Sequence, residues 1–275
     1  MNTCTVLLDN SNVNFPHAKC SHGLSLFLEI DNLKILFDTG SNTDFIFNAT
    51  LLKKNLNTVD SVVLSHAHYD HGCGYTSFVK SFRCRELICS DRFFYDKYAL
   101  IDGVYYYKGV DFDEKFLNCF VIHTSYVEKT LKLADRVYIH SNIKNTEEFE
   151  SLPKNYFIKE SDGYKNDKFL DESVLVVDNK DGLTLVVGCS HPGIVSIVKA
   201  VSAIHGKKVK TIIGGLHLAK AKKERIEKVI AALEEEGVEK AYLGHCTGNK
   251  VVEKINKMDS KMEAYSFSIG AVIDM

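Results

Sequence analysis

The stretch at residues 61–72, SVVLSHAHYDHG, places three histidines and an aspartate within six residues, directly after a short apolar run. A short apolar run bounded by turn residues is typical of a buried strand, and Gly72 and Gly74 mark the turn before the next element. Residues i and i+2 at a strand end project to the same side, so the imidazoles of His66 and His68 converge. The stretch therefore predicts a strand whose end presents metal ligands.

Asp70 and His71 lie in the turn beyond the first two histidines. They can face a second ion about 3.5–4 Å from the first, which is the spacing of two-metal hydrolytic sites. Histidine nitrogens with one carboxylate favour zinc and also accept manganese or iron. The alternative is a polar turn whose histidines are incidental, and four metal-competent side chains in six residues argue against it.

Length and charge limit the class of protein. The chain has 275 residues and a net charge of −2. We expect a single domain over residues 1–275 with an aromatic-rich insertion at about 90–171. This net charge gives no excess of positive charge that would bind nucleic acid or an anionic membrane, so we expect a small-molecule substrate. The chain can also form a homo-oligomer. The eight cysteines form no CxxC pair and no secretion signal precedes them, which indicates reduced thiols in the cytoplasm.

Apolar and alternating runs predict strands at 3–8, 24–30, 34–37, 61–64, 173–177, 183–187, 210–213 and 240–243. Helical periodicity and caps predict helices at about 43–55, 72–80, 193–205, 220–236 and 248–257. Because the strand and helix pattern recurs in the second half, we expect two sheets packed together with helices outside, a layered αβ/βα arrangement of two similar halves. The aromatics of 90–171 fit an insertion over a pocket and a core-filling set equally well.

Three later histidines also follow apolar strands: His191 in VVGCSHPG, His217 in TIIGGLHL and His245 in AYLGHCTG. Strand ends are where a sheet delivers ligands into a crevice. The remaining histidines of the later chain and the N-terminal loop have no such setting, and we expect them to be surface or packing residues: His17, His123, His140 and His205.

The HxHxDH pattern after an apolar strand resembles the metallo-β-lactamase superfamily. The resemblance implies a four-layered αβ/βα sandwich of two mixed β-sheets flanked by helices. It implies one or two divalent metal ions, a metal-bound hydroxide, and later ligands that complete both metal positions. On this basis His191 completes the first position with His66 and His68, and His245 completes the second with Asp70 and His71.

The resemblance also implies a bridging aspartate, and here the chain departs from the pattern. The candidate strand ends carry Gly188-Cys189 and Gly215-Leu216-His217 instead. If Cys189 takes that place, a thiolate can bind or bridge the metals. If His217 takes it, the bridge is lost and an imidazole lines the site. A buried apolar thiol is the structural alternative for Cys189.

Three further positions can support the site. Asp38 in FDTG can accept the second ring N–H of a metal-ligating histidine, it can be part of a turn and helix cap, or both roles can hold together. His22 in SHGLS can reach the site from the first sheet, or it can be a structural histidine. Asp171 and Glu172 precede a strand and are either acids that orient ligands or solvated loop charges.

Seven fragments narrow the resemblance over about residues 20–250: SHGLSLFLEI, ILFDTG, LSHAHYDHG, LDESVLVV, GCSHPGI, GGLHL and GHCTG. Together they are similar to a subgroup of metal-dependent hydrolases that resemble an archaeal dihydropterin-ribofuranosyl-aminobenzene-phosphate synthase. One departure is Ser21, where many members carry a glutamate before His-Gly-Leu-Ser.

These observations predict metal-assisted hydrolysis of an ester, amide or phosphoester. Asp70 is then both ligand and proton acceptor, and His217 a proton donor or oxyanion partner. Two alternatives stay open. One is a synthase-like transferase that forms a C–N bond on a dihydropterin, and the other is a non-catalytic ligand sensor on the same fold.

Overall fold

The computed structural model describes residues 2–13, 15–258 and 260–275, and the chain divides into two compact units. Unit 1 consists of Met1–Val127, Pro153–Asp167 and Ser268–Met275, and unit 2 consists of Glu128–Leu152 and Lys168–Phe267. Each unit contains its own seven-stranded mixed sheet with its own hydrophobic core.

The main sheet of unit 1 has the strand order β18-β1-β2-β3-β4-β5-β8. Its strands are β1 (Thr3–Leu8), β2 (Ser25–Ile30), β3 (Leu33–Phe37), β4 (Ser61–Val63), β5 (Glu86–Ser90), β8 (His123–Val127) and β18 (Val272–Asp274). The pairings from β18 to β3 are antiparallel, whereas those from β3 through β4 and β5 to β8 are parallel. The carboxyl ends of β3, β4 and β5 therefore open at one edge of the sheet, where side chains from separate segments can meet.

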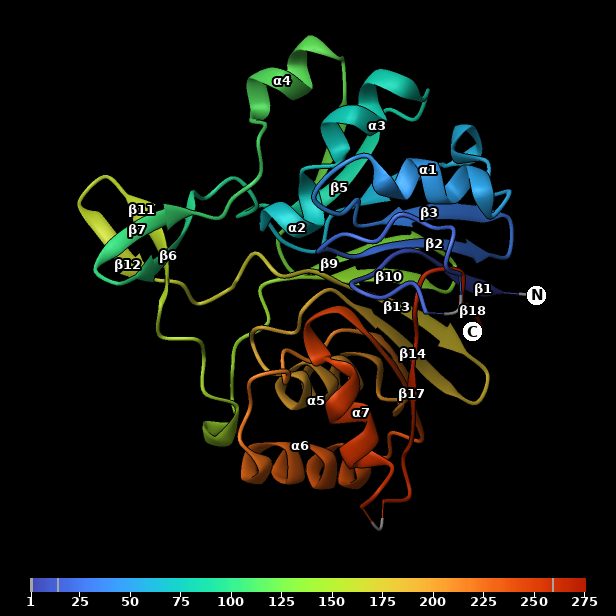
Figure 1. Cartoon of the computed structure of the whole chain (residues 1–275), viewed down its shortest axis with the longest axis vertical. Coiled ribbons are helices and arrows are strands. Elements are labelled where there is room, and N and C mark those ends of the chain that lie inside the picture. Colours follow the sequence, from blue (N-terminus) through green and yellow to red (C-terminus); the bar gives the residue numbers. More distant parts are fainter. Residues whose placement is uncertain (1, 14, 259) are drawn as a thin grey trace. The chain divides into compact units, whose positions relative to one another are not determined.

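Helices α1 (Asp44–Leu51) and α3 (Tyr75–Ser81) cover one face of this sheet (Figure 1). Their apolar residues are buried against the strands, with Phe45 and Phe78 both at 0% exposure. The helix predicted at 43–55 ends earlier than expected because Lys53 has a left-handed φ of 57°. The helix predicted at 72–80 is preceded by a separate short turn, α2 (Tyr69–Gly72).

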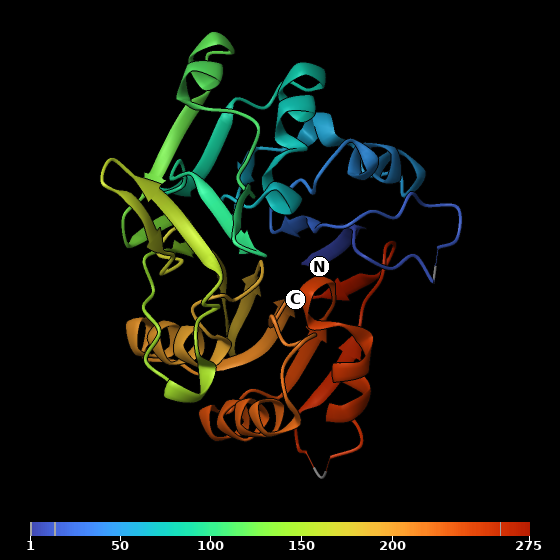
Figure 2. The ribbon, with the colours of Figure 1, turned by 60° about the vertical axis from the view of Figure 1, so that its left-hand side comes forward.

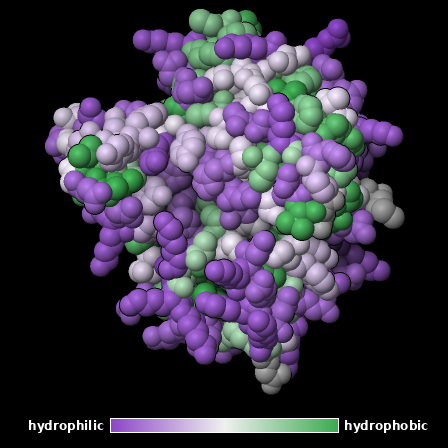
Figure 3. Space-filling view, viewed as in Figure 1, coloured by the Kyte–Doolittle hydropathy of each residue, from purple (hydrophilic) through white to green (hydrophobic). Residues whose placement is uncertain are grey.

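Unit 1 also carries a small antiparallel sheet in the order β12-β11-β6-β7, which projects at the left of Figure 1. Its strands are β6 (Lys97–Ile101), β7 (Val104–Tyr107), β11 (Tyr156–Glu160) and β12 (Gly163–Asn166). The buried Lys97 Nζ lies 2.8 Å from the buried Asp167 Oδ2, and removing one partner of such a pair costs about 3–5 kcal/mol. The small sheet shows hydrophobic side chains on its surface in Figure 3 and includes the exposed Ile101 and Val104.

Unit 2 repeats the topology of the main sheet in unit 1. Its order is β17-β16-β15-β14-β13-β10-β9. Its strands are β9 (Thr130–Ala134), β10 (Val137–His140), β13 (Val174–Asn179), β14 (Gly182–Val187), β15 (Val209–Gly214), β16 (Lys240–Leu243) and β17 (Glu263–Ser266). The pairings from β9 to β14 are antiparallel and those from β14 to β17 are parallel. The carboxyl ends of β14, β15 and β16 consequently share one edge.

Three helices cover one face of the unit 2 sheet, as Figures 1 and 2 show: α5 (Ile194–His205), α6 (Lys223–Glu236) and α7 (Asn249–Ile255). The predicted apolar stripe of α6 is buried, from Ile226 through Leu233. Gly237 ends this helix in the left-handed region, with φ of 90°, as the sequence predicts.

The prediction of two mixed sheets with flanking helices is confirmed, and all eight predicted strands are present. The segment 90–171 contributes strands to all three sheets, and its aromatic side chains range from the buried Phe93, at 0% exposure, to the exposed Tyr106, at 49%. The single-domain boundary with an insertion stays a prediction. Among the described residues, no helix combines the length and apolar character needed to cross a membrane.

Candidate functional site

The HxHxDH residues of unit 1 follow β4 and enter α2. His66 is 1% exposed, His68 5%, Asp70 8% and His71 0%. His68 keeps an extended backbone as the residue before α2, and its carbonyl accepts the N–H groups of His71 and Gly72. The tight turn therefore carries four metal-competent side chains into one buried region.

The four side chains of this nitrogen and oxygen cluster approach one another closely. His66 Nε2 lies 3.0 Å from His68 Nδ1, and the rings of His66 and His71 have centroids 4.2 Å apart. His71 Nε2 lies 3.9 Å from Asp70 Oδ2. Such a concentration of nitrogen lone pairs beside a carboxylate is stabilised by a proton or by a bound cation.

Buried partners hold the Nδ1 side of two of these rings. Asp38 Oδ2 lies 2.6 Å from His71 Nδ1, and Ser65 Oγ lies 2.9 Å from His66 Nδ1. Ser65 donates its backbone N–H to Asp38 Oδ1 at 2.7 Å and its hydroxyl to Asp38 Oδ2 at 2.7 Å. This arrangement fixes the orientation of both rings through their Nδ1 atoms.

Asp38 thus makes the kind of contact that the sequence suggested. The alternative helix-cap role is wrong, because α1 begins at Asp44 with Thr43 as its N-cap. Asp38 has a left-handed φ of 58°, and its N–H donates to the Val63 carbonyl at 2.9 Å. The strained turn therefore directs the carboxylate toward the end of β4 rather than toward a helix.

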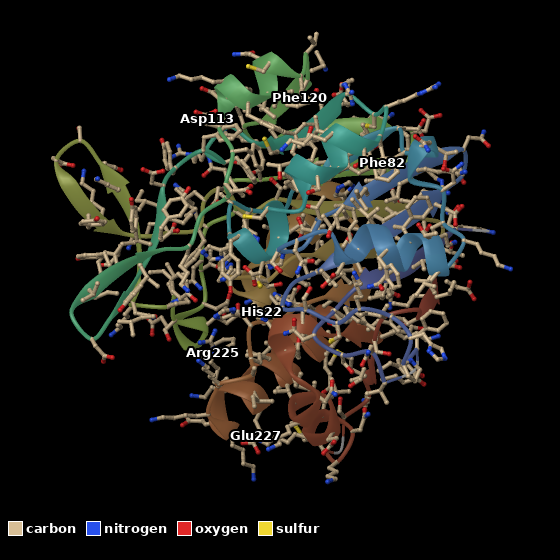
Figure 4. The ribbon with its side chains drawn as sticks, turned by 45° about the horizontal axis from the view of Figure 1, so that its top comes forward. His22, Phe82, Asp113, Phe120, Arg225 and Glu227 are labelled. Atoms are coloured by element: carbon tan, nitrogen blue, oxygen red, sulfur yellow. The ribbon has the colours of Figure 1, made fainter. Side chains whose placement is uncertain are left out.

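His22 approaches the same cluster from the loop between β1 and β2 (Figure 4). Its Nε2 lies 3.1 Å from Asp70 Oδ2, although the side chain is 56% exposed. The next residue, Gly23, has φ of 149°, and a Cβ there would lie 2.5 Å from the Asp70 carbonyl oxygen. Only glycine allows this close approach, which places the imidazole on the carboxylate.

Three contacts to the motif come from the small sheet and from the two residues that follow β7, and they carry no local sequence signal. The ring of Tyr156 lies 5.3 Å from that of His68, and Tyr69 donates its N–H to the Lys108 carbonyl at 2.9 Å. His68 also forms an isolated antiparallel bridge with Gly109. Tyr156 comes from β11, far along the chain, so only the folded structure shows the contact.

Unit 1 contains a cavity of about 400 Å³ beside the motif, at Ala67. Aromatic side chains and three carboxylates line it: Phe93, Phe94, Tyr95, Tyr107, Phe112, Phe116, Asp96, Asp111 and Asp113. Asp113 caps α4 (Glu114–Cys119), and Figure 4 labels it at one end of that helix with Phe120 at the other. Among the residues that the structure describes, no lysine or arginine lines this cavity, which therefore offers stacking surfaces and hydrogen-bond acceptors.

In unit 2, a buried carboxylate organises the loop after β14. Glu172 accepts the backbone N–H groups of Cys189, Ser190 and His191, the last at 2.8 Å. Glu172 Oε2 also lies 2.9 Å from His191 Nδ1, and Phe169 stacks on the His191 ring at 4.4 Å between centroids. Glu172 is therefore a buried carboxylate that orders this loop and orients the His191 ring through Nδ1, rather than a solvated charge.

Three neighbouring strand ends of unit 2 bring together Cys189, His217 and Cys246, which we call the thiol cluster. One ligand atom from each lies within 4.8 Å of the other two. His217 donates its backbone N–H to Cys246 Sγ at 3.3 Å, and Cys246 Sγ donates to the Cys189 carbonyl at 3.7 Å. Both sequence candidates for the bridging position therefore lie in one cluster, together with Cys246, for which the sequence predicts no role.

The thiol cluster has unusual electrostatics. Burial raises the pKa of the Cys246 thiol, but hydrogen bonds with Cys189 and His217 outweigh it and hold that pKa well below its ordinary value. Burial lowers the pKa of His217, whereas the Cys246 contact, followed by Glu172, raises it above its ordinary value overall. His245 lies next to this cluster in sequence, is buried, and begins the short turn η3 (His245–Thr247).

Residues 18–198 match the model of the metallo-beta-lactamase superfamily, over more than half of the chain. The chain belongs to the metallo-β-lactamase superfamily. The match includes the whole HxHxDH stretch, together with Cys189 and His191. The resemblance stated from the sequence is thereby confirmed.

Known proteins extend this assignment. A 7,8-dihydropterin-6-methyl-4-(β-D-ribofuranosyl)-aminobenzene-5'-phosphate synthase from Methanocaldococcus jannaschii is 33% identical over 244 residues, covering 83% of this chain and 82% of the relative. A solved structure of a metal-dependent hydrolase of the β-lactamase superfamily has a TM-score of 0.86 at 26% identity, covering 100% of this chain and 99% of that one. A diphosphatase from the PhnP family has a TM-score of 0.52 at 12% identity, covering 100% and 98%, and is similar in fold alone. The metallo-β-lactamase fold is thus confirmed, while the relatives include both a synthase and a hydrolase.

Proposed function

We propose that this protein is a metal-dependent enzyme that hydrolyses an ester, amide or phosphoester bond in a small molecule. The observation that carries the proposal is the buried cluster in unit 1, where Ser65 and Asp38 hold the Nδ1 atoms of His66 and His71. The proposed ligands for one or two divalent ions are His66, His68, Asp70, His71, His191 and His245. Nitrogen and carboxylate donors with oriented imidazoles fit zinc, and also manganese or iron.

The chain's own residues supply the proton chemistry. A bound divalent ion lowers the pKa of water to about 7 and polarises a carbonyl or phosphoryl oxygen. Asp70 Oδ2 accepts the proton of the attacking water, and general-base catalysis of this kind contributes about 10²- to 10⁴-fold. His22 Nε2, at 3.1 Å from the same oxygen, holds the carboxylate in position.

His217 is the second proposed catalytic residue. The sequence suggests a proton donor or an oxyanion partner, and either role needs a ring nitrogen that can turn to substrate. Nδ1 of His217 is buried and has no hydrogen-bond partner among the residues that the structure describes. This atom is therefore the one proposed to donate a proton to the departing group.

Metal-dependent turnover tests the hydrolase proposal. The protein is stripped with a chelator, reloaded separately with zinc, manganese and iron, and assayed with a panel of esters, amides and phosphoesters. We expect turnover only after reloading, and we expect His66→Ala to lose both metal and turnover while His123→Ala, in an exposed histidine away from the motif, keeps both. A protein that binds metal and small molecules yet turns none over would contradict the proposal and favour the ligand sensor.

A synthase-like reaction is the second candidate function, and the aromatic cavity of unit 1 favours it. Flat heterocycles stack on aromatic side chains, and their amino and ring N–H groups donate to carboxylates such as Asp96 and Asp111. The relative named as a dihydropterin-linked synthase points to the same ligand chemistry. The test supplies a dihydropterin phosphate donor with an aminobenzene acceptor. Formation of an amine adduct supports this candidate, and ester cleavage without an adduct rejects it.

A further inference from the structure

The thiol cluster lies at three neighbouring parallel strand ends. Cys189 follows β14, His217 follows β15 and Cys246 follows β16, and these strands pair directly in the order β14-β15-β16. A parallel sheet with such ends is a rigid base, because each donor is attached within a few residues of a buried strand. The three donors are therefore held close together by the sheet itself.

The backbone around the cluster is arranged for close approach. A Cβ on Gly215 would lie 2.4 Å from Cys246 Sγ and 2.7 Å from the Gly188 carbonyl oxygen. His217 has a left-handed φ of 51°, which costs conformational energy in a residue other than glycine. The loop after β15 thus adopts a strained path that brings the imidazole to the thiols.

The donor set has a clear chemical preference. Two cysteine sulfurs and one imidazole are soft to borderline donors, and Cys2His with an open fourth position is a known zinc ligand set. Zn–S bonds of about 2.3 Å place two thiolates of a tetrahedral site roughly 3.8 Å apart. The donor atoms here already lie within 4.8 Å of one another, so a small closure of the side chains suffices.

The unpartnered ring nitrogen supports the same use. His217 Nδ1 is buried, and among the described residues it has no hydrogen-bond partner. A buried polar atom without a partner destabilises the folded chain, and a metal ion removes that cost when it accepts the lone pair. The nitrogen and oxygen cluster of unit 1 differs in having its Nδ1 atoms hydrogen-bonded.

We infer that Cys189, His217 and Cys246 bind a soft divalent metal ion of the zinc class through two thiolates and one imidazole. Metal binding releases the two thiol protons to solvent, and no electron transfer is involved. This assignment goes beyond the proposed hydrolase function. It is an alternative to the proton-donor role proposed for His217, because one ring nitrogen cannot both bind a metal and donate a proton, and the His217→Gln measurement below decides between the two roles.

Cobalt spectroscopy tests the inference directly. Reduced, chelator-treated full-length protein is titrated with Co²⁺ without oxygen, and the thiolate-to-cobalt charge-transfer band in the near ultraviolet is recorded. We expect a band that grows with added Co²⁺, falls by about half in Cys189→Ser or Cys246→Ser, and disappears in the double variant. Cys20→Ser and Cys119→Ser, in two exposed cysteines of unit 1, are the matched controls and keep the full band.

His217→Gln separates the two uses of the ring. If His217 is a ligand, Co²⁺ affinity measured from the band falls, whereas a proton donor would leave the band unchanged and change only turnover. X-ray absorption at the zinc edge provides a second measurement on the zinc-loaded protein, with two sulfur neighbours expected per thiol-cluster ion and one in Cys246→Ser.

The outcomes also distinguish this inference from the proposed function. Bound cobalt or zinc with turnover but without sulfur neighbours overturns the inference and leaves the hydrolase proposal standing. A full charge-transfer band without turnover supports the inference and contradicts the hydrolase proposal. Circular dichroism of each variant identifies those that fail to fold, and for these the zinc-edge measurement on the wild-type protein decides.

Discussion

The two units share a sheet topology and differ in how their strand ends carry chemistry. Both main sheets have three antiparallel pairings followed by three parallel ones. In unit 1 a single strand end, after β4, carries four nitrogen and oxygen donors within six residues. In unit 2 the donors are distributed over three strand ends and include sulfur. The same scaffold can therefore concentrate ligands in one turn or collect them from several.

The two units also orient their histidines in related ways. Asp38 in unit 1 holds His71 and the Ser65 backbone, and Glu172 in unit 2 holds His191 and three backbone N–H groups. Each carboxylate is fully buried, with exposures of 0% and 1%. The comparison shows that a carboxylate from a different segment fixes the ring in both units, while Glu172 has the additional task of shaping a loop.

The largest expected effect concerns the proton acceptor of unit 1. Asp70→Asn keeps the size of the side chain but cannot accept the proton, so kcat/KM for hydrolysis should fall by about 10²- to 10⁴-fold. Steady-state kinetics over a range of pH, with metal content measured on the same samples, checks this. His123→Gln supplies the control. A variant that loses less than a factor of ten while retaining its metal would show that unit 1 does not supply the base.

A second prediction concerns the loss of folding stability at low pH, which we attribute to a histidine pair of unit 2. His140 Nε2 lies 2.9 Å from His205 Nε2, and Thr130 Oγ lies 2.9 Å from His140 Nδ1. Burial, and then His205, lower the pKa of His140 from 6.5 to about 4. Burial also lowers the pKa of His205, against an opposing effect of Asp178, while Lys207 lowers it further.

The sign follows from proton binding. Between pH 6.5 and 4 the unfolded chain holds a proton on His140 that the folded chain does not, so the free energy of unfolding falls as the pH drops through this range, by up to about 3 kcal/mol. His140→Gln should reduce this loss, as measured by urea unfolding at pH 7.5 and 4.5. His123→Gln in unit 1 is the matched substitution. If the free energy of unfolding falls equally in the wild type and in His140→Gln between pH 7.5 and 4.5, the histidine pair of unit 2 is not the source of acid sensitivity.

The smallest effect compares the two orienting carboxylates. Asp38→Asn and Glu172→Gln each weaken the hold on an imidazole, and loss of such a partner lowers metal affinity by about 10- to 100-fold. Competition with a chromogenic chelator measures the affinity. We expect Glu172→Gln also to lower the unfolding midpoint more than Asp38→Asn, because three loop N–H groups lose a charged acceptor. If the metal affinity of either variant is unchanged, that carboxylate does not orient a metal-binding imidazole, and the two units differ in this respect.

Local patterns predict much of this molecule. The strands are short apolar runs, and their period is set by the pleat, so their positions follow from sequence. The cluster of His66, His68, Asp70 and His71 is equally local, because one turn after β4 fixes all four. Helix ends are less accurate, since the left-handed Lys53 and the separate turn at Tyr69–Gly72 depend on backbone conformation that residue type does not specify.

Contacts between segments that lie far apart in the chain cannot be predicted from local sequence patterns. The Tyr156 ring beside His68 and the Glu172 carboxylate under His191 depend on which strands pair. Cys246 directly follows the predicted ligand His245, so its position after a strand is a signal that the sequence does contain. Only the order of the strands in the sheet, in which β14, β15 and β16 are neighbours, shows that Cys246 lies beside Cys189 and His217.

The sequence by itself determined the superfamily, the pattern of strands and the four nitrogen and oxygen donors at residues 66–71. The strands follow from local apolar runs, and the four donors all lie in one turn after one strand. The tertiary structure decided that Cys189, His217 and Cys246 lie within 4.8 Å of one another. Parallel pairing joins strands across intervening helices, and no periodicity along the chain encodes which strand ends then become neighbours.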